Sequence, residues 1–577
     1  MPISLALIWH QHQPYYKDLV SGDMVLPWVR LHGVKDYYGM ARLLSEFPDM
    51  RCTINLVPSL LIQLLDYVEN DASDPFLKRS ALNADALSGD DICFILDHFF
   101  MTQWNRMINI HPRYRQLLEL RHFGRQSAQV AAKSFKPRDM RDLQVWANLV
   151  WFHPVSFEES PLLRELLKKG ADFSEQDKSA LLQEQKQVLA RVIPLHKELA
   201  ARGQVELTTT PFYHPILPLL NDMRSCQMAL PRNPLPNGQT SLADDAEMQI
   251  KQAVACHQRI FGSAPEGMWP AEGAVSHEIV PMIARHGISW IATDEEILSA
   301  TLNTRLRGGS GKLERADLLY RPWIVQSGDA KLNILFRDHQ LSDLIGFQYQ
   351  SWDGVAAADD FLRRAQAPAP VAGERLVTVI LDGENCWEHY PDQGVKFLRA
   401  LYGKLERGKQ HVASVRVRDY LSEHPPQNRL DKLFAGSWIN HNFYIWVGHS
   451  EDRRAWEYVY QARADLVAAT AVRKAAAPDD LNLACAWEEL YIAEGSDWYW
   501  WYGDDHSSGN DEVFDQLFRA HLKNVYKFIG QPAPVFLDVP IKSVAPASHI
   551  NPESNLKVPA FLRDTVHGVT GEYSGNK

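Results

Sequence analysis

The side chains best able to do chemistry follow short apolar runs in this sequence. Asp382 and Glu384 come directly after 376–381, a run rich in β-branched residues, and Glu272 follows a shorter run that ends at Trp269. Cleavage of a glycosidic bond needs two carboxyl groups, one to attack the anomeric carbon or activate water and one to donate a proton. The donor must hold its proton at neutral pH, so burial or a like charge has to raise its pKa.

Glu272 and Asp382 form the best candidate pair. Each directly follows a predicted strand, and each has a tryptophan close by in sequence, Trp269 and Trp387. Glu384 lies further along its loop, in a position suited to binding hydroxyl groups. An Asp-Gly turn after a strand is also common without any function, and this alternative remains open for Asp382 on local sequence alone.

Histidines follow two other predicted strands. His10 and His12 are two residues apart, so both side chains would point to the same side of a continuing strand. His214 follows a third strand and lies among aromatic residues and prolines. Two interpretations compete: these histidines are metal ligands completed by a further group, or neutral hydrogen-bonding groups in a polar pocket.

The elements that would position these residues alternate between strand and helix, which predicts a parallel α/β architecture. We expect about seven parallel strands, too few for an eightfold barrel, and hence an incomplete barrel whose active face lies at the carboxyl ends of the strands. A helical insertion interrupts it around 70–200. Residues 1–405 form the predicted barrel domain, and 406–577 a mainly helical domain. The runs that can supply these strands number eight and cover 3–9, 51–57, 204–210, 265–269, 288–292, 321–325, 332–337 and 376–381.

One segment of the C-terminal region lacks helical periodicity. Residues 498–502 are five successive aromatic residues, and Gly-Asp-Asp-His follows them. Such a loop would expose apolar area unless it packs on another surface. We predict that the segment 493–506 folds back over the mouth of the barrel; the alternative is a plug between domains.

Composition excludes several classes of partner. The net charge of −11 argues against nucleic acid, and no apolar stretch approaches the ~20 residues of a membrane span. The six cysteines are scattered without a CxxC pair, which disfavours a disulfide framework or zinc knuckle. The first residues lack the basic region and cleavage site of a signal peptide, so we expect a cytoplasmic protein acting on a neutral substrate.

Five blocks of sequence carry a specific resemblance. In chain order they are WHQHQPYY (9–16), ELTTTPFYHPILPLL (206–220), GMWPAEGAVS (267–276), LDGENCWEHY (381–390) and AEGSDWYWWYGDDH (493–506). Together they resemble the five sequence regions of glycoside hydrolase family 57, above all its α-amylase and amylopullulanase-like members. The resemblance covers residues 1 to about 530. It implies an incomplete (β/α)7 barrel and a retaining mechanism on α-glucans, with no metal or other cofactor.

The resemblance also implies roles for individual residues. Glu272 in the third block would be the nucleophile, and Asp382 in the fourth would be the acid/base. His10 and His12 would line the subsite that holds the reacting sugar. The remaining residues that we expect to contact substrate are His214, Trp269, Glu384, Trp387 and, from the fifth block, Trp500, Trp501, Asp504, Asp505 and His506.

The sequence therefore predicts a retaining glycoside hydrolase of α-amylase or amylopullulanase type, which acts on glycogen, starch or maltodextrins. An α-amylase would cleave their α-1,4 bonds, and an amylopullulanase would cleave α-1,6 bonds as well. A 4-α-glucanotransferase or a branching enzyme of the same family is the main alternative, because the catalytic pair does not encode the acceptor. A metal-dependent enzyme built on the histidines is a second alternative. A glucan-binding protein without activity is a third, which the presence of both carboxylates disfavours. The sequence predicts no oligomeric state.

Overall fold

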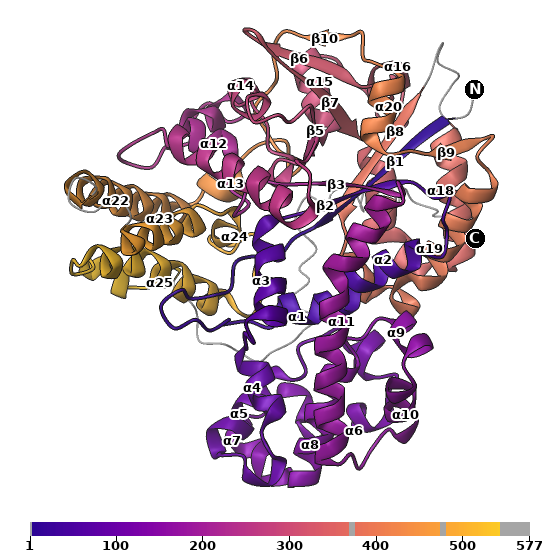
Figure 1. Cartoon of the computed structure of the whole chain (residues 1–577), viewed down its shortest axis with the longest axis vertical. Coiled ribbons are helices and arrows are strands. Elements are labelled where there is room, and N and C mark those ends of the chain that lie inside the picture. The colour runs from indigo at the N-terminus through magenta and orange to yellow at the C-terminus, as the bar shows by residue number, and fades with distance from the viewer. Residues whose placement is uncertain (1–2, 368–374, 474–479, 543–577) are drawn as a thin grey trace, which may run out of the picture.

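The computed structural model of the chain describes residues 3–367, 375–473 and 480–542. Within them, seven parallel strands form an incomplete barrel at the centre of the molecule (Figure 1). Strands β3, β2, β1 and β8 pair in that order in one sheet, and β7, β5 and β4 pair in a second. The strands span β1 (Ile3–Gln11), β2 (Cys52–Leu56), β3 (Val205–Thr208), β4 (Gly267–Met268), β5 (Trp290–Asp294), β7 (Ala330–Arg337) and β8 (Leu376–Asp382).

The two sheets meet at two seams. Thr209, just after β3, forms an isolated parallel bridge with Met268 of β4. On the other side, the Asp338 N–H donates to the Thr378 carbonyl of β8 at 2.8 Å. Because single contacts replace full ladders at both seams, the ring of strands is closed only loosely. The expected (β/α)7 barrel is confirmed.

Helices cover the sheets and explain why the strands are apolar without alternation. β2 is buried along its whole length, and β8 from its first residue to Leu381. Parallel strands buried on both faces have this continuous pattern. The covering helices of the barrel are α2 (Tyr38–Leu44), α3 (Pro58–Glu69), α12 (Leu217–Asn221), α13 (Ala243–Phe261), α14 (Val280–Ala284), α15 (Glu295–Leu302), α17 (His339–Asp343), α18 (Gly354–Gln366), α19 (Val395–Arg407) and α20 (Val417–Glu423).

One predicted barrel strand is not part of the barrel. The run 321–325 was expected to be parallel to its neighbours, but β6 (Trp323–Ser327) pairs antiparallel with β7. A tight turn at Gly328, whose φ is +59°, joins the two into a hairpin. Strand β6 in turn pairs with the short β10 (Arg429–Leu430), and β9 (Val412–Ser414) pairs with β1. The apolar pattern predicted the strand correctly but carries no information on its direction.

A helical insertion separates β2 from β3, and it forms the lower lobe in Figure 1. Its longest helix begins with a capping box, in which Ser174 and Asp177 satisfy the first backbone N–H groups. The insertion comprises α4 (Pro75–Ala81), α5 (Gly89–His98), α6 (Pro112–Leu120), α7 (Ala128–Ala131), α8 (Pro137–Leu149), α9 (Pro154–Glu159), α10 (Pro161–Lys169) and α11 (Glu175–Ala201).

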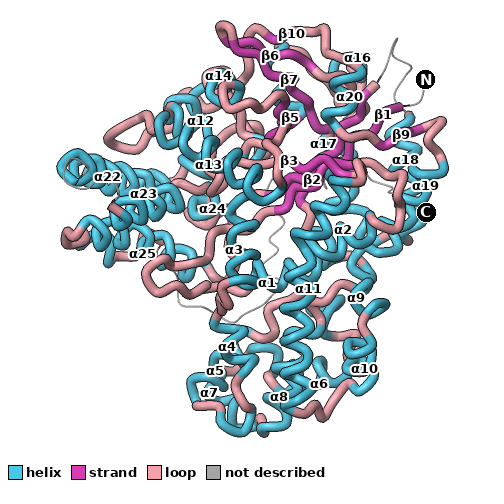
Figure 2. The backbone as a smooth tube through the Cα atoms, viewed as in Figure 1, coloured by secondary structure: helices cyan, strands magenta, loops and turns pink. Residues whose placement is uncertain are grey.

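After residue 440 the described chain is helical, as Figure 2 shows at the left of the molecule. This part contains α21 (Tyr444–Val447), α22 (Ser450–Arg473), α23 (Leu481–Ala493), α24 (Ser496–Tyr499) and α25 (Asp511–Ile529). Among the described residues, no helix combines the length and apolar character that a membrane span requires. The predicted division of the chain near residue 405 stays a prediction.

Candidate functional site

Polar side chains stand at the carboxyl ends of the barrel strands. The register of β1 and β8 places His10 directly opposite Asp382. Next along the sheet, Asn55 near the end of β2 binds His10, with 2.7 Å between Asn55 Oδ1 and His10 Nδ1. Because the strands are parallel, all of these groups open on the same face of the barrel.

Glu272 occupies a strained turn directly behind β4. Its backbone is in the left-handed region, with φ of 58° and ψ of 22°. Gly273 follows with φ of +59°, and a Cβ on it would come within 2.7 Å of the Trp269 ring. A non-glycine residue with positive φ is uncommon and occurs at functional sites more often than elsewhere. The turn fixes the Glu272 carboxylate against Trp438, whose Nε1–H donates to Oε2 at 2.7 Å.

Glu272 and Asp382 lie close enough for each to affect proton binding at the site. Burial raises the pKa of Glu272 to about 8 against the opposing Trp438 hydrogen bond, and the charges of Asp382 and Asp497 add to the rise. Burial also raises the pKa of Asp382. Because both pKa values are raised, the pair holds a proton at neutral pH, and the carboxyl group that carries this proton when substrate is bound is the one that can act as the acid.

The three predicted histidines form one cluster. The rings of His12 and His214 stack with centroids 3.8 Å apart, and the His10 ring lies 5.3 Å from that of His214. His214 Nδ1 is 2.9 Å from Ser496 Oγ and 4.0 Å from Glu272 Oε1. The cluster therefore touches both carboxylates' surroundings, through His214 at Glu272 and through His10, which is paired with Asp382 in the sheet.

Burial keeps two of these rings neutral. It lowers the pKa of His10 to about 3 and holds the pKa of His214 well below its usual value. His12 Nδ1 and His214 Nε2 are buried without a hydrogen-bond partner among the described residues. The three rings can each offer a nitrogen within 4.8 Å of the others. The donor set thus fits sugar hydroxyls and would also fit a divalent cation.

A cationic side chain lies against the Trp438 ring. The Arg337 guanidinium lies 5.1 Å from the centroid of the Trp438 ring, at the end of β7. It is held there by Asp294 Oδ2 at 3.2 Å and by Asp343 Oδ1 at 2.8 Å. Its charge also acts to lower the pKa of Asp382. Arg337 therefore links the surroundings of both carboxylates.

The remaining predicted residues of the third and fourth blocks are buried. Trp269 and Trp387 are each only 1% exposed, so neither ring presents a face to a ligand. Trp387 donates instead to the Gly383 carbonyl at 2.9 Å and supports the Asp382 loop from below. Burial raises the pKa of Glu384 well above its usual range, and its Oε2 has no partner among the described residues. Such an orphaned oxygen beside Asp382 can form a hydrogen bond with a hydroxyl group.

The fifth block contacts the site through other residues than expected. Asp497 Oδ1 is 2.7 Å from His12 Nε2, and Ser496 contacts His214. The segment is not an open loop at this point, because residues 496–499 form the short helix α24 with Trp498 and Tyr499 buried. The sequence did not predict this helical turn, because the aromatic run has no amphipathic periodicity.

The later residues of that block lie elsewhere. Trp500 stacks on His506 at 4.2 Å, and Trp501 packs on Phe514 at 5.2 Å. Asp504 and Asp505 face His449, at 3.8 and 3.2 Å from its Nε2. None of these contacts involves Glu272, Asp382 or the three histidines.

Sequence reasoning missed five residues of the cluster: Asn55, Arg337, Trp438, Ser496 and Asp497. Asp497 and Ser496 stand inside a quoted block and were passed over for the more conspicuous aromatic and acidic residues after them. Asn55 and Arg337 each lie at the end of a predicted strand, which was an available signal. Trp438 carried none, because nothing local connects it to Glu272, 166 residues away.

Comparisons with known proteins show the family of this chain. The model of glycosyl hydrolase family 57 matches residues 6–432. A curated relative, α-amylase 1 of Dictyoglomus thermophilum, is 31% identical over 99 residues, which are 17% of this chain and only 11% of that enzyme. The chain thus matches about a tenth of that relative's length.

Solved structures of the family share the fold. A branching enzyme from Thermococcus kodakaraensis has a TM-score of 0.58 at 15% identity, covering 92% of this chain and 90% of that one. An α-amylase from Thermotoga maritima has a TM-score of 0.54 at 14% identity, with 91% and 93% covered. A 4-α-glucanotransferase from Thermococcus litoralis has 0.51 at 12% identity, with 91% and 60% covered. The chain belongs to glycosyl hydrolase family 57.

Proposed function

We propose that the protein is a retaining α-glucan-active enzyme that cleaves α-1,4 glucosidic bonds by double displacement. The observation that carries the proposal is the pair of buried carboxyl groups, Glu272 and Asp382, whose pKa values are both raised and which stand beside the histidine cluster. Glu272 is the nucleophile, because it accepts a hydrogen bond from Trp438, a group that can only donate and so favours the ionised carboxylate. Asp382 is the acid/base.

In the first step, Asp382 donates its proton to the glycosidic oxygen as Glu272 attacks the anomeric carbon. The leaving chain departs with that proton as a free hydroxyl, and a glycosyl ester on Glu272 remains. The unpartnered nitrogens of His12 and His214 are available to hydroxyl groups of the reacting sugar. Asp497 and Ser496 fix these rings through their other nitrogens, which presets the tautomers.

In the second step, Asp382 removes a proton from the acceptor, which attacks the same carbon and releases Glu272. Water as the acceptor gives hydrolysis, and a sugar hydroxyl gives transfer. The resemblance of the sequence blocks to α-amylase and amylopullulanase-like members favours hydrolysis. Branching enzymes and a glucanotransferase share the fold, so transfer is the second candidate function.

Product analysis tests the proposal. The protein is incubated with maltoheptaose and, separately, with pullulan, and the products are separated by chromatography. We expect shorter maltooligosaccharides from maltoheptaose. Longer or branched products would show that the protein catalyses transfer and not hydrolysis. Maltotriose from pullulan would mean α-1,6 cleavage, and panose would mean α-1,4 cleavage. Unchanged glucan after long incubation would contradict the proposal. Parallel incubations with EDTA distinguish the two interpretations of the histidine cluster, because a metal-dependent reaction would stop.

Replacing Trp438 by phenylalanine tests the assignment of Glu272 through pH. Loss of the N–H bond destabilises the ionised carboxylate, so the pKa of Glu272 rises above its value of about 8. Loss of ionised nucleophile produces the acidic limb of kcat/KM, and this limb should therefore move to higher pH, by about one unit. The variant leaves Asp382 in place, and with it the other charged and titratable groups around the pair: His12, His214, Arg337 and Asp497.

Trp487 supplies the matched control, because its indole donates to Thr470 between helices of the C-terminal region. The profile of Trp487→Phe should superimpose on that of the unmodified protein. A Trp438→Phe variant with lower kcat/KM but an unmoved acidic limb would show that Trp438 does not act through the ionisation of Glu272.

A further inference from the structure

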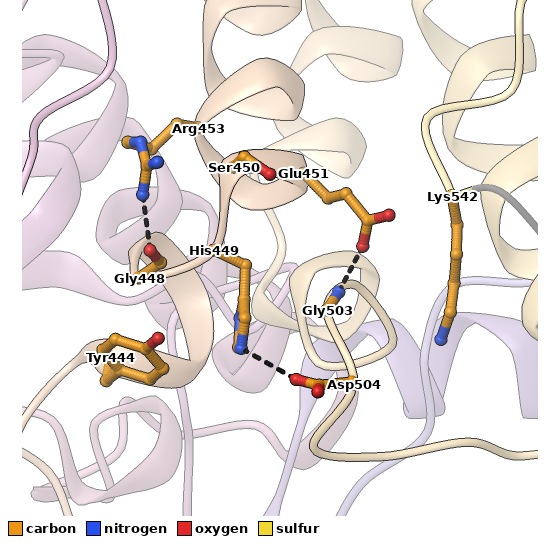
Figure 3. A pocket seen from close by; sticks show the side chains of 9 residues that line it. All are labelled: Tyr444, Gly448, His449, Ser450, Glu451, Arg453, Gly503, Asp504 and Lys542. Atoms are coloured by element: carbon orange, nitrogen blue, oxygen red, sulfur yellow. Dashed lines mark hydrogen bonds and ion pairs between the residues drawn. The ribbon is translucent and has the colours of Figure 1, made fainter.

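A second pocket lies between the start of α22 and the turn that follows α24. Its volume is about 560 Å³, and it opens widely to solvent. Figure 3 shows the His449 ring between Tyr444 and Asp504, with Glu451 and Lys542 on the same side of the ring as Asp504. None of the groups around Glu272 and Asp382 lines it.

Backbone contacts hold the aromatic wall of this pocket in place. Tyr444 is 42% exposed, and its ring meets that of His449 edge to face at 4.9 Å. A Cβ on Gly448 would lie 2.4 Å from the Tyr444 ring, and a Cβ on Gly503 would lie 2.5 Å from that of His449. Glycine at both positions lets the chain pack directly against the two rings. An exposed ring that is braced in this way is a preformed platform.

The polar wall is anchored as well. His449 Nδ1 is 3.0 Å from the buried Asp452 carboxylate, and the Gly503 N–H donates to Glu451 Oε2 at 2.6 Å. Lys542 Nζ donates to the Trp501 carbonyl at 2.6 Å and contacts Asp511. Asp504, by contrast, has a fully exposed side chain, and among the described residues its carboxylate has only the distant contact to His449. One carboxylate is thus free to bind while the groups around it are fixed.

This combination matches the chemistry of a sugar chain. An aromatic face with a few polar groups at its edge packs on the C–H face of a pyranose and binds its hydroxyl groups. Two carboxylates, of Glu451 and Asp504, and two cationic groups, of Arg453 and Lys542, line the pocket, so it favours neither an anion nor a cation by charge alone.

The pocket is also tied to the catalytic cluster by a single short segment. Ser496 and Asp497 at the start of α24 contact the histidines, and Trp501, just beyond its end, binds Lys542 at the pocket. Helix α21, which carries Tyr444, packs against α24.

We propose that this pocket is an accessory binding site for α-glucan, which holds a part of the chain remote from the scissile bond. The proposal rests on the proposed function for its ligand class. It gives Asp504 a role in substrate binding away from the reacting sugar, with Tyr444 as the stacking platform.

The test compares Tyr444→Ala and Asp504→Ala with the unmodified protein on amylose and on the shortest maltooligosaccharide that the protein processes. Loss of the platform should raise KM for amylose about tenfold more than KM for the short substrate. Asp504→Ala should give about a threefold difference in the same direction. Phe123→Ala is the matched control, because Phe123 is 40% exposed but lies on the helical insertion.

Retardation of the protein in amylose-containing gels gives a readout that does not depend on turnover. The proposal is supported if Tyr444→Ala loses retardation while Phe123→Ala is retarded as strongly as the unmodified protein. This result supports the binding site even if the reaction is not the one proposed. Equal changes in KM for both substrates, or no change in either KM, would overturn the proposal. Titration with Ca²⁺ or Zn²⁺ covers the remaining outcome: cation binding that Asp504→Ala abolishes, with amylose binding intact, would make His449, Asp504 and Asp505 a metal site instead.

Discussion

Replacing Glu272 by alanine should lower kcat on maltooligosaccharides by more than about a thousandfold, because covalent catalysis has no alternative route. The side chain is 16% exposed and lies beside His214, so its removal leaves the packing behind it in place. Added azide can enter the vacated position and attack the anomeric carbon. Partial recovery of activity, with an inverted glycosyl azide as product, is the expected result.

Glu266 provides the control for this variant. It lies at the opposite end of β4, with its side chain 56% exposed and a single weak contact to Arg418. Activity of Glu266→Ala should equal that of the unmodified protein. If Glu272→Ala kept more than about a thousandth of the original kcat, the assignment of the nucleophile would be wrong.

Asp382→Asn should abolish proton transfer while leaving the nucleophile intact. Asparagine is close in shape to aspartate but cannot donate and recover a proton, and general acid–base catalysis contributes about 10²–10⁴ in rate. We expect kcat on maltooligosaccharides to fall by about a thousandfold. A maltosyl fluoride needs little protonation of its leaving group, so the first step on this substrate should be much less affected, and a burst of fluoride should precede slow turnover.

The control is Asp359→Asn, an exposed carboxylate on α18 that pairs with Lys404. It should react like the unmodified protein on both substrates. An Asp382→Asn variant equally slow in the first step on maltosyl fluoride and on maltooligosaccharides would exclude Asp382 as the proton donor, and Glu384 would become the next candidate.

The sequence was sufficient for the strands that carry chemistry. β1 and β8 are nearly continuous apolar runs that end in polar residues, and in a parallel sheet this pattern predicts both burial and the position of the active face. The direction of β6 was not predictable in the same way. Pairing is decided by the turn at Gly328 and by the neighbouring β7, and the apolar run of one strand contains neither.

The candidate site was less predictable than the fold, because its contacts join distant segments. His12 and Asp497 are 485 residues apart, yet their side chains meet at 2.7 Å. The role of tryptophans near carboxylates was also ambiguous in the sequence. Trp387 has the type of side chain that stacks on sugars, but it is buried beneath the loop that it supports. Local sequence indicates which residue types are available, whereas the tertiary fold decides which ring face remains open.

Trapping the glycosyl intermediate distinguishes double displacement at Glu272 from every other route. A fluorinated maltosyl fluoride that forms the ester quickly and releases it slowly is added to the protein, and the labelled peptide is identified by mass spectrometry. The double-displacement account predicts one added glycosyl unit per chain, on the peptide that contains Glu272, and no label in Glu272→Ala. A label on a peptide without Glu272, or turnover of the same reagent with inversion and no label, would contradict it.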